Sequence, residues 1–559
     1  MKKKIIAFLL ATPAALLAAP PSLPPGAGVI EREIEQAYEG KPLELHKDAP
    51  SIEIDIPEER LSLDENAKVF IKTISLEGNR VVPDKEIQKW IEGFLGKELT
   101  IADIYKICQV IDQHYAEKGY FLTRAYPPPQ DIQDGHLVLK ILEGKIGVIK
   151  IVGNKYYSTK FIQSYFEPFS KDCLNYNRFL KALLLLNENT DLSAGVLFEK
   201  GEEPGTADLI VQVSDKRPIH LSFNENNYGR DLTTNSQLGG KFDWGNCLFY
   251  GDTLSVAQVA GFPLNALYFT NASYTVPVNT KGTSIDLAYL FSKFHIEQLG
   301  ALHLRGESQI ATFKTIQALT RTKTLSADVF GYFDYKQIQN FVLQYRSSYD
   351  QLRVVTLGGL IDHYNTSAGR DYLNMRCAFG IPNFLGGMGA VSDQSSRIGG
   401  GGRFVQLNLD YDRIQRIRKE WMFSFHTSGQ WSPSKLTLPQ QIYVGGASSV
   451  RGYPLSVILG DSGYYANVET RFPLPFLQEH RFLWTKKKWK DAFQLVGFFD
   501  TGGTFFNAGN STFIHGTGFG LRILGPYTLS LSFDLGFPLN HPDLSEGAFG
   551  YLKVTAQAF

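Results

Sequence analysis

The sequence Tyr-Thr-Leu-Ser-Leu-Ser-Phe-Asp-Leu-Gly-Phe at residues 527–537 places an apolar side chain at every second position. Small or acidic residues mostly occupy the positions between them. Because successive side chains of a strand point to opposite faces, this order predicts a strand with one apolar and one polar face. The alternation recurs at residues 285–292 and 405–412. We therefore expect a set of two-faced strands.

The region with this pattern extends from residue 217 to residue 559. A soluble sandwich also has two-faced strands, but it needs only a modest number of them, and here about 340 residues carry the pattern. Aromatic residues make up 13% of the chain and 52 residues are glycine, which is typical of a barrel with aromatic girdles. At about 21 residues for a strand and its connection, residues 217–559 predict a transmembrane β-barrel of about 16 antiparallel strands.

Two short segments of the barrel region carry opposite charges. Val450-Arg451-Gly452-Tyr453 places a cation among glycines, where the backbone can turn sharply. Phe498-Phe499-Asp500-Thr501-Gly502 places an anion at the end of an apolar run. An arginine offers a planar fork of donors to a carboxylate, and breaking such a pair when it is buried costs roughly 3–5 kcal/mol. We predict that Arg451 and Asp500 tether a loop, the alternative being two unrelated turn residues.

An internal repeat precedes the barrel region. Residues 74–80 match residues 149–155 at an offset of 75, and each copy continues from a Gly-Asn turn into helical periodicity. In the first copy, the apolar positions of residues 101–115 fall on one helix face. Each copy ends in strand-like runs, which gives a β-α-α-β-β unit. We predict two small α+β domains, at residues 68–144 and 145–216.

The first 67 residues differ from the rest. Residues 1–19 combine lysines, an interrupted apolar run and small residues, which predicts a secretory signal peptide rather than a membrane anchor. Residues 20–67 contain a helical candidate followed by a linker rich in proline and acidic residues. This segment is either a disordered leader or a detachable helix on a tether. The apolar face of the candidate helix comprises Ile30, Ile34 and Tyr38.

The sequence offers no recognisable catalytic, metal or cofactor site. The formal net charge is zero, so no basic field attracts nucleic acid. The chain has neither a phosphate-binding G-x-x-x-x-G-K-[ST] segment nor a G-x-S-x-G nucleophile elbow, and its eleven histidines lack metal-ligand spacing. We expect a protein that is not an enzyme and needs no cofactor. Wide spacing favours four isolated, mostly buried thiols over a Cys108–Cys173 disulfide, the other two cysteines being Cys247 and Cys377.

Over nearly its whole length the chain resembles a two-partner secretion translocator of the haemolysin-activator type (TpsB; ShlB/FhaC/HecB), in the superfamily that includes the BamA insertase. Tyr126-Pro127-Pro128-Pro129-Gln130, followed by Glu143-Gly144-Lys145-Ile146-Gly147, is similar to the family's signature near the junction of its two POTRA domains. The segment of Arg451 is similar to the tip motif of the family's sixth extracellular loop. The segment of Asp500 is similar to the F-x-D-x-G motif of the barrel wall.

The resemblance implies a function. The POTRA domains would bind an unfolded exoprotein in the periplasm by adding a strand to a sheet edge, and the barrel would secrete it without nucleotide hydrolysis. Arg451 and Asp500 would form a salt bridge inside the lumen, and the helix would plug the pore at rest. The expected partners are a large, β-helical, TpsA-like exoprotein, the lipid bilayer and the barrel assembly machinery. The accompanying motif positions are Val450, Gly452, Tyr453, Phe498 and Gly502.

Three other interpretations stay open at this point. An insertase of outer-membrane barrels shares the arginine motif, but it usually carries more POTRA repeats and lacks the leading helix. A passive porin with a periplasmic module would be steadily open. A soluble exported β-sandwich enzyme would be found in the soluble periplasmic fraction.

Overall fold

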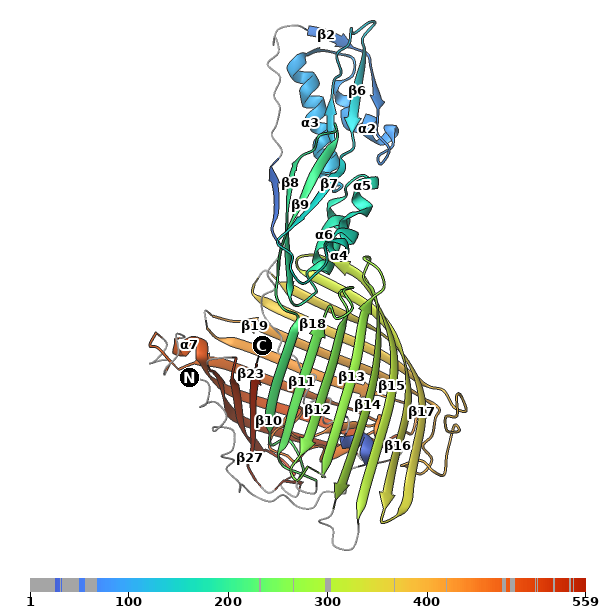
Figure 1. Ribbon diagram of the computed structural model, residues 1–559, viewed down its shortest axis with the longest axis vertical. Coiled ribbons are helices and arrows are strands. Elements are labelled where there is room, and N and C mark those ends of the chain that lie inside the picture. The colour runs from blue at the N-terminus through green and yellow to red at the C-terminus, as the bar shows by residue number, and fades with distance from the viewer. Residues whose placement is uncertain are drawn as a thin grey trace.

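Two small domains stand in a column at one mouth of a closed barrel (Figure 1). The predicted signal peptide, Ile34 and Tyr38 lie outside the residues that the structure describes. Within those residues, no helix is long and apolar enough to cross a membrane. The computed structural model describes residues 26–30, 32, 50–55 and 68–558, apart from 231–232, 265, 297–302, 366, 419, 475–478, 483–487, 508, 510, 526–527, 542–543 and 546.

The first domain is a small sheet covered by two helices. Its central strand β6 is parallel to β3 and antiparallel to β5. A second pair of strands, β2 and β4, was not predicted from the repeat. The elements are β2 (Lys68–Ile71), β3 (Thr73–Glu77), α2 (Asp84–Ile91), η2 (Glu92–Phe94), β4 (Lys97–Thr100), α3 (Ile101–Glu117), β5 (Arg124–Tyr126) and β6 (His136–Leu142).

Helix α3 begins at a reciprocal cap. The main-chain N–H of Asp103 donates to Thr100 Oγ1 over 3.2 Å, and the Thr100 N–H donates to the Asp103 carboxylate over 3.1 Å. This capping box satisfies two donors that a helix start leaves free. The face predicted from the spacing of residues 101–115 is buried in the domain core, including Cys108 and Tyr115.

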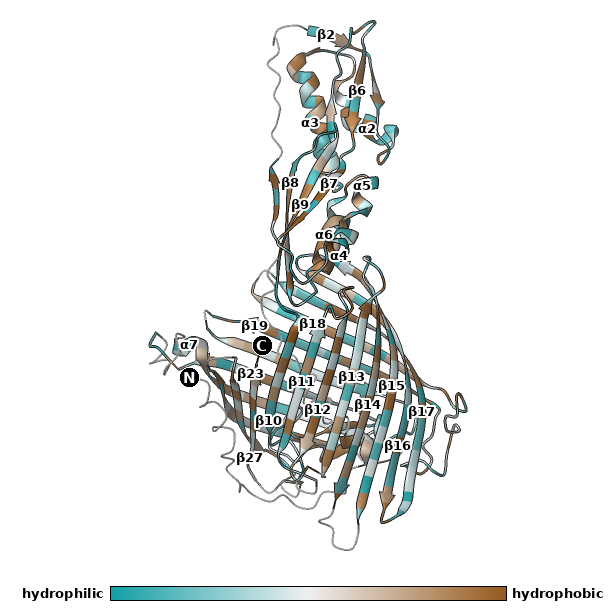
Figure 2. Cartoon of the chain, viewed as in Figure 1, coloured by the Kyte–Doolittle hydropathy of each residue, from teal (hydrophilic) through white to brown (hydrophobic). Residues whose placement is uncertain are grey.

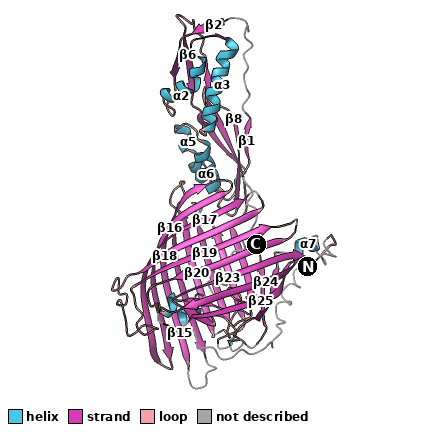
Figure 3. Cartoon of the chain, turned by 180° about the vertical axis from the view of Figure 1, so that it is seen from behind, coloured by secondary structure: helices cyan, strands magenta, loops and turns pink. Residues whose placement is uncertain are grey.

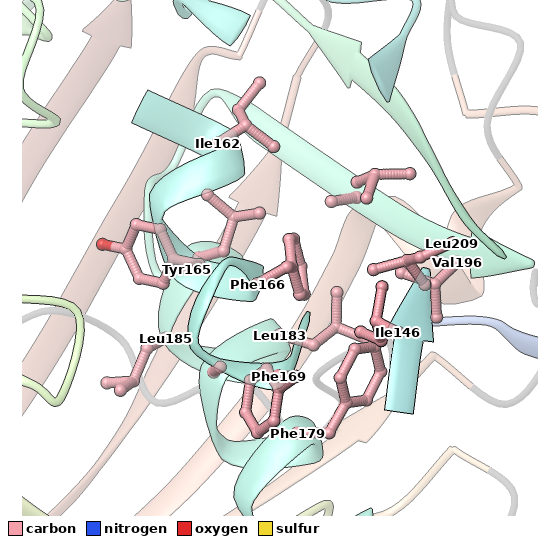
Figure 4. Close-up of a cluster of buried hydrophobic side chains, with 14 of the residues drawn as sticks. Ile146, Ile162, Tyr165, Phe166, Phe169, Phe179, Leu183, Leu185, Val196 and Leu209 are labelled. Atoms are coloured by element: carbon pink, nitrogen blue, oxygen red, sulfur yellow. The ribbon is translucent and has the colours of Figure 1, made fainter. Parts of the chain in front are cut away.

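The second domain repeats this plan. Helices α4, α5 and α6 pack side chains such as Phe166, Phe169 and Phe179 against the strands β7, β8 and β9 (Figure 4). The strand order of the sheet is β1-β8-β9-β7. The elements are β7 (Lys145–Val152), α4 (Thr159–Phe166), α5 (Pro168–Lys171), α6 (Tyr176–Leu186), β8 (Leu192–Lys200) and β9 (Thr206–Asp215).

The edge strand β1 (Ile52–Asp55) comes from the N-terminal linker. It lies parallel to β8, with Ile52 opposite Val196 and Asp55 opposite Glu199. The interpretation of this stretch as linker was therefore wrong for these four residues. A strand forms here because the edge of β8 supplies main-chain partners that the local sequence cannot provide.

Sixteen antiparallel strands close into the barrel, as predicted (Figure 3). Closure comes from β10 and β27, which pair from Ser222 with Gln557 to Asn226 with Lys553. The strands are β10 (Ile219–Asn226), β11 (Gln237–Gly245), β12 (Thr253–Gly261), β13 (Leu267–Pro277), β14 (Thr283–Ile296), β15 (Leu304–Arg321), β16 (Leu325–Val342), β17 (Tyr345–Asn365), β18 (Gly369–Gly380), β19 (Phe404–Arg416), β20 (Met422–Trp431), β23 (Ser462–Pro473), β24 (Phe493–Phe505), β25 (Ser511–Leu524), β26 (Ser530–Pro538) and β27 (Phe549–Gln557).

The period-two pattern of the sequence separates the outer and inner faces of the wall. On β14, Leu287 and Tyr289 are each 49% exposed on the outside, whereas Leu290 points inward and is buried. Figure 2 shows the resulting alternation of hydrophobic and hydrophilic residues along the strands. An apolar outer face suits lipid, and a more polar inner face suits a lumen.

The second domain contacts the rim of the barrel that faces it. Arg321 at the end of β15 pairs with Glu188 of the domain and with Asp328 of β16. The Lys181 ammonium on α6 donates to the Ala318 carbonyl over 2.8 Å. These contacts hold the second domain on the part of the rim formed by β15 and β16.

All four cysteines are free. Cys108 is buried in the first domain, but the other three side chains are partly exposed, so the expectation of mostly buried thiols was wrong for them. Their positions at a domain junction, a rim turn and a barrel strand explain this exposure, because none of these lies in a closed core.

Candidate functional site in the barrel lumen

A long connection folds back into the barrel from the mouth opposite the two domains. This connection, loop 6, comprises residues 432–461 and is the sixth of eight at that end. It contains η3 (Leu438–Gln440) and the paired strands β21 (Ile442–Val444) and β22 (Ile458–Gly460). Apolar side chains of loop 6 pack against the inner wall in a cluster of Ile442, Val444, Val450, Tyr453, Ile458, Tyr465 and Ile514.

Arg451, at the tip of loop 6, is bound to the wall by three carboxylates. Its Nε and Nη2 donate to the two oxygens of Asp500 on β24, over 2.8 and 3.0 Å, and its main-chain N–H donates to the same carboxylate over 3.1 Å. Its Nη1 donates to Glu469 on β23 over 3.0 Å and to Asp534 on β26 over 3.3 Å. Arg451 is 5% exposed and Asp500 is fully buried.

Two further arginines complete this charge cluster. Arg522 on β25 lies 2.6 Å from Asp534 and 3.4 Å from Glu469, and Arg471 lies 2.6 Å from Glu469. Three guanidinium groups therefore face three carboxylates. The balance matters because an unpaired buried charge is costly, whereas a paired and hydrogen-bonded one is tolerated.

The ring of the wall residue Phe498 also contacts the guanidinium of Arg451. The guanidinium carbon of Arg451 lies 3.4 Å from the centroid of the Phe498 ring. Such a cation–π contact contributes about 0.5–2 kcal/mol, depending on burial. Phe498 and Asp500 both point inward because they are two residues apart on β24.

Glycines allow the loop backbone to approach the wall. Gly452 has a φ of +98°, and a Cβ there would lie 2.6 Å from the Phe537 carbonyl carbon. On the wall side, a Cβ at Gly516 would overlap the Arg451 carbonyl oxygen, and one at Gly536 would lie 2.5 Å from the Gly452 nitrogen. Gly502 likewise leaves room for Val444, 2.7 Å from a Cβ placed there.

Tyr453 anchors the far side of the tip. It is fully buried, and its hydroxyl donates to Asn540 Oδ1 over 2.8 Å and to the His515 carbonyl over 3.1 Å. The Tyr551 hydroxyl donates to the Tyr453 carbonyl over 2.7 Å. The tip is therefore held by uncharged groups of β25, β27 and the connection between β26 and β27, as well as by the charges.

A helical turn at residues 27–30 also lies against the inner wall. Ala27 and Ile30 are buried in a cluster with inward side chains of β12 to β16, among them Phe294. The Ala27 N–H donates to Asn340 Oδ1 over 2.8 Å. In Figure 1 this dark blue turn lies within the outline of the barrel, toward the end remote from the two domains.

The helical turn is linked to loop 6. A Cβ at Gly28 would lie 2.6 Å from Pro439 of η3, so the turn packs directly on the loop. Arg32 Nη1 donates to the Gln441 carbonyl over 2.8 Å. The two segments that occupy the lumen are therefore in contact with each other.

A second ion pair fixes the base of loop 6. Arg397 belongs to loop 5, residues 381–403, and both of its terminal nitrogens bind the fully buried Asp461. Asp461 also accepts the Leu436 N–H over 3.0 Å. Nothing in the sequence pattern marked this pair, since both residues lie outside recognisable motifs.

The groups of the cluster are engaged with one another. Across the described part of the chain, no group of three or more His, Cys, Asp or Glu side chains is placed to hold a metal ion. The arginine and carboxylate groups of the cluster bind one another. What they do is position a loop inside a barrel.

Comparison with known families matches this architecture. The model of the haemolysin secretion/activation protein ShlB/FhaC/HecB matches residues 205–523, and that of the ShlB-type POTRA domain matches residues 69–144. The chain belongs to the haemolysin secretion/activation family.

Relatives of this family are transporters. The heme/hemopexin transporter HuxB of Haemophilus influenzae is 22% identical over 418 residues, covering 72% of this chain and 71% of HuxB. The outer membrane transporter CdiB of Escherichia coli is 22% identical over 421 residues, covering 73% and 70%. The hemolysin transporter HpmB of Proteus mirabilis is 21% identical over 457 residues, covering 79% of each chain.

Solved structures share the fold. CdiB from Escherichia coli superposes with a TM-score of 0.71 at 19% identity, covering 90% of this chain and 92% of CdiB. BamA from Haemophilus ducreyi without its POTRA domains 1–3 gives 0.51 at 13% identity, covering 88% and 100%. This member of the haemolysin secretion/activation family is an outer-membrane β-barrel transporter of a secreted protein, with its POTRA domains in the periplasm. The family match favours secretion over barrel insertion.

Proposed function

We propose that this transporter secretes a large β-helical exoprotein through the barrel lumen, which the helical turn and loop 6 occupy at rest. The observation that supports this proposal most directly is the contact between the helical turn and loop 6 inside the barrel. Ala27 binds Asn340 of β16, Arg32 binds Gln441 of loop 6, and Arg451 binds Asp500 of β24. A client can pass only after the helix leaves, so the helix acts as a plug.

Client capture would use the outer edges of the POTRA sheets. The edge of β8 accepts β1 as an added parallel strand, which supports its use by an extended client segment in the same way. In the first POTRA domain, the corresponding edge strand β5 pairs only with β6 within the described residues. Main-chain hydrogen bonds at such edges give affinity without demanding one client sequence.

The proposed cycle links capture to opening. A client strand that displaces β1 from β8 frees the linker between the POTRA domains and the plug helix. The helix can then leave Asn340 and the inner wall. Transport needs no nucleotide hydrolysis and no enzymatic step, since folding of the client outside the cell provides the direction. The barrel itself would be inserted by the barrel assembly machinery.

A deletion experiment tests this function. A strain that lacks the transporter but expresses its client exoprotein should retain that exoprotein inside the cell. Other outer-membrane barrels should stay at their normal levels. Normal export of the exoprotein would refute the proposal, and a general loss of other barrels would support the insertase function instead.

A further inference from the structure

A shallow depression lies on the lipid-facing side of the barrel, over β17 to β20. It has a volume of about 610 Å³. The lining side chains that face outward are almost entirely apolar, and they include the exposed Leu357 and Trp431. This surface is separate from the lumen, because Arg376 and Gln430 of the same strands point inward.

Strand register explains the depression. Leu357, Cys377, Leu407 and Trp431 lie opposite one another in one row across four strands. The next row, toward the periplasm, runs from Gly359 through Met375 and Leu409 to Gly429. Small residues at Gly359, Cys377 and Gly429 lower the surface between large neighbours, so the wall has a hollow there rather than a smooth apolar face.

Cationic side chains lie at the outer end of this hollow. Arg403 directly precedes β19, and the alternation of the strand places its side chain on the outer face with those of Val405 and Leu407. It is four residues from Leu407, which is about 13 Å along a strand. Lys435 of loop 6 follows Ser434, whose hydroxyl accepts the Val405 N–H. Both cations are exposed, and neither forms an ion pair among the described residues.

The neighbouring acid does not neutralise these cations. Asp461 is fully buried and is already bound by Arg397. Arg403 therefore presents positive charge at the extracellular end of an apolar hollow, and the Lys435 ammonium lies beside Gly399 of the same loop 5 that ends at Arg403. In a bilayer with a hydrocarbon core about 30 Å thick, we expect this end to lie at the level of the outer-leaflet headgroups.

We propose that the depression binds a phosphorylated acyl lipid of the outer leaflet, with one acyl chain along Cys377 and Gly429 and a phosphate at Arg403 and Lys435. The charges favour an anionic headgroup, and the hollow favours a hydrocarbon chain over a flat contact. Loop 6 contributes Lys435, so a bound lipid would contact the same loop whose tip carries Arg451.

Native mass spectrometry of the full chain in detergent tests the site. Lipid A, which carries two phosphates, is titrated against phosphatidylethanolamine of similar chain length. Wild type should retain one lipid A at concentrations where phosphatidylethanolamine is lost. Gly429→Phe should lower lipid A retention at least tenfold, because the ring fills the hollow. A Cβ at Gly429 meets nothing closer than 3.9 Å, so the backbone at this position has room for a side chain.

Matched controls make the result decisive. Gly497→Phe adds the same ring at another outward glycine, where a Cβ meets nothing within 4 Å, and should retain lipid A like wild type. Arg403→Gln combined with Lys435→Gln should lose the preference for lipid A, whereas Arg346→Gln, near the start of β17, should keep it. The double glutamine variant keeps the test independent of whether Gly429→Phe assembles.

Three results would overturn the proposal. One is equal retention of lipid A by wild type, Gly429→Phe and the double glutamine variant. Another is equal retention of lipid A and phosphatidylethanolamine by wild type. The third is a dimer of the chain that Gly429→Phe abolishes, which would assign the hollow to a second copy of the protein.

Discussion

The guanidinium carbon of Arg451 lies 3.4 Å from the ring centroid of Phe498. The same guanidinium binds Asp500, so the tip of loop 6 is held by a stack and a charge pair from one strand, β24. Loop 6 in turn contacts the helical turn through Pro439 and Gln441. Two segments inside the barrel therefore contact each other as well as the wall.

Replacing Asp500 by alanine should reduce client export at least tenfold while the barrel still reaches the membrane. The change removes the carboxylate that receives three donors from Arg451, and breaking a buried pair of this kind costs roughly 3–5 kcal/mol. Arg451→Ala should behave in the same way. Secreted client is measured alongside heat-modifiable migration of the barrel, and wild-type export in both single variants would refute the tether.

Glycine substitutions test the fit of the loop without altering charge. A Cβ at Gly516 would overlap the Arg451 carbonyl oxygen, so Gly516→Ala should displace the loop tip and expose it to proteases. Gly497→Ala is the control, because Gly497 lies on the neighbouring strand β24 and a Cβ there meets nothing within 4 Å. Equal protease sensitivity of the two variants would contradict the close approach.

Loosening the plug helix should open the pore. Ile30 is 4% exposed in an apolar cluster, so Ile30→Asp places a charge there that has no water and no partner in the cluster. In planar bilayers, the channel of this variant should conduct most of the time, and so should the channel of a variant that lacks residues 20–45. Ile30→Leu keeps the apolar contact and should stay mostly closed. A wild-type open fraction in Ile30→Asp would argue against a plug at this position.

The first POTRA domain should lose stability between about pH 4 and pH 6. Burial raises the pKa of the Asp112 carboxyl from its ordinary value of 3.8 to about 6. Because the pKa of Asp112 is higher in the folded state, its contribution to stability is full while the pH is below the pKa of the unfolded chain. That contribution is lost as the pH rises through the pKa of the folded domain. Asp112→Asn should remove this part of the pH dependence, because an amide oxygen can still accept the Ala125 N–H.

Urea unfolding followed by the Cys108 thiol measures this effect. Cys108 is 3% exposed, and burial raises its pKa to about 12, so it reacts only once the domain opens. Serine replaces the other three cysteines, and a pyridyl disulfide serves as a label that reacts at acidic pH. An unfolding midpoint in urea that is the same at pH 4 and pH 6.5 would contradict the prediction.

Local pattern was enough to predict the barrel and the principal pair. The outward phase of the apolar residues at every second position of 529–537 follows directly from alternation, and Arg451 stands out because glycines surround it. Glu469 and Asp534 were missed, since on a barrel strand an inward carboxylate looks like any other lumen residue. Only the pairing of β23 to β26 brings them to the same guanidinium.

Long-range pairing explains the remaining omissions. β1 has four residues in a proline-rich linker, and its partner β8 begins about 140 residues later, so no local periodicity could reveal it. Arg397 and Asp461 meet because loops 5 and 6 share one mouth of the barrel. The contact of Gly28 with Pro439 likewise depends on a helix and a loop entering the same lumen.

The most direct test of the account is to fix the helical turn to the wall. Gly26 and Asn340 suit a short thiol-to-thiol cross-linker, since a Cβ at Gly26 would lie 3.5 Å from Oδ1 at the end of the Asn340 side chain. In a background with the native cysteines replaced by serine, Gly26→Cys/Asn340→Cys joined by a reducible bis-methanethiosulfonate should export no client, and reductant should restore export. Wild-type export by the fully cross-linked chain would contradict the claim that the helix must leave the lumen.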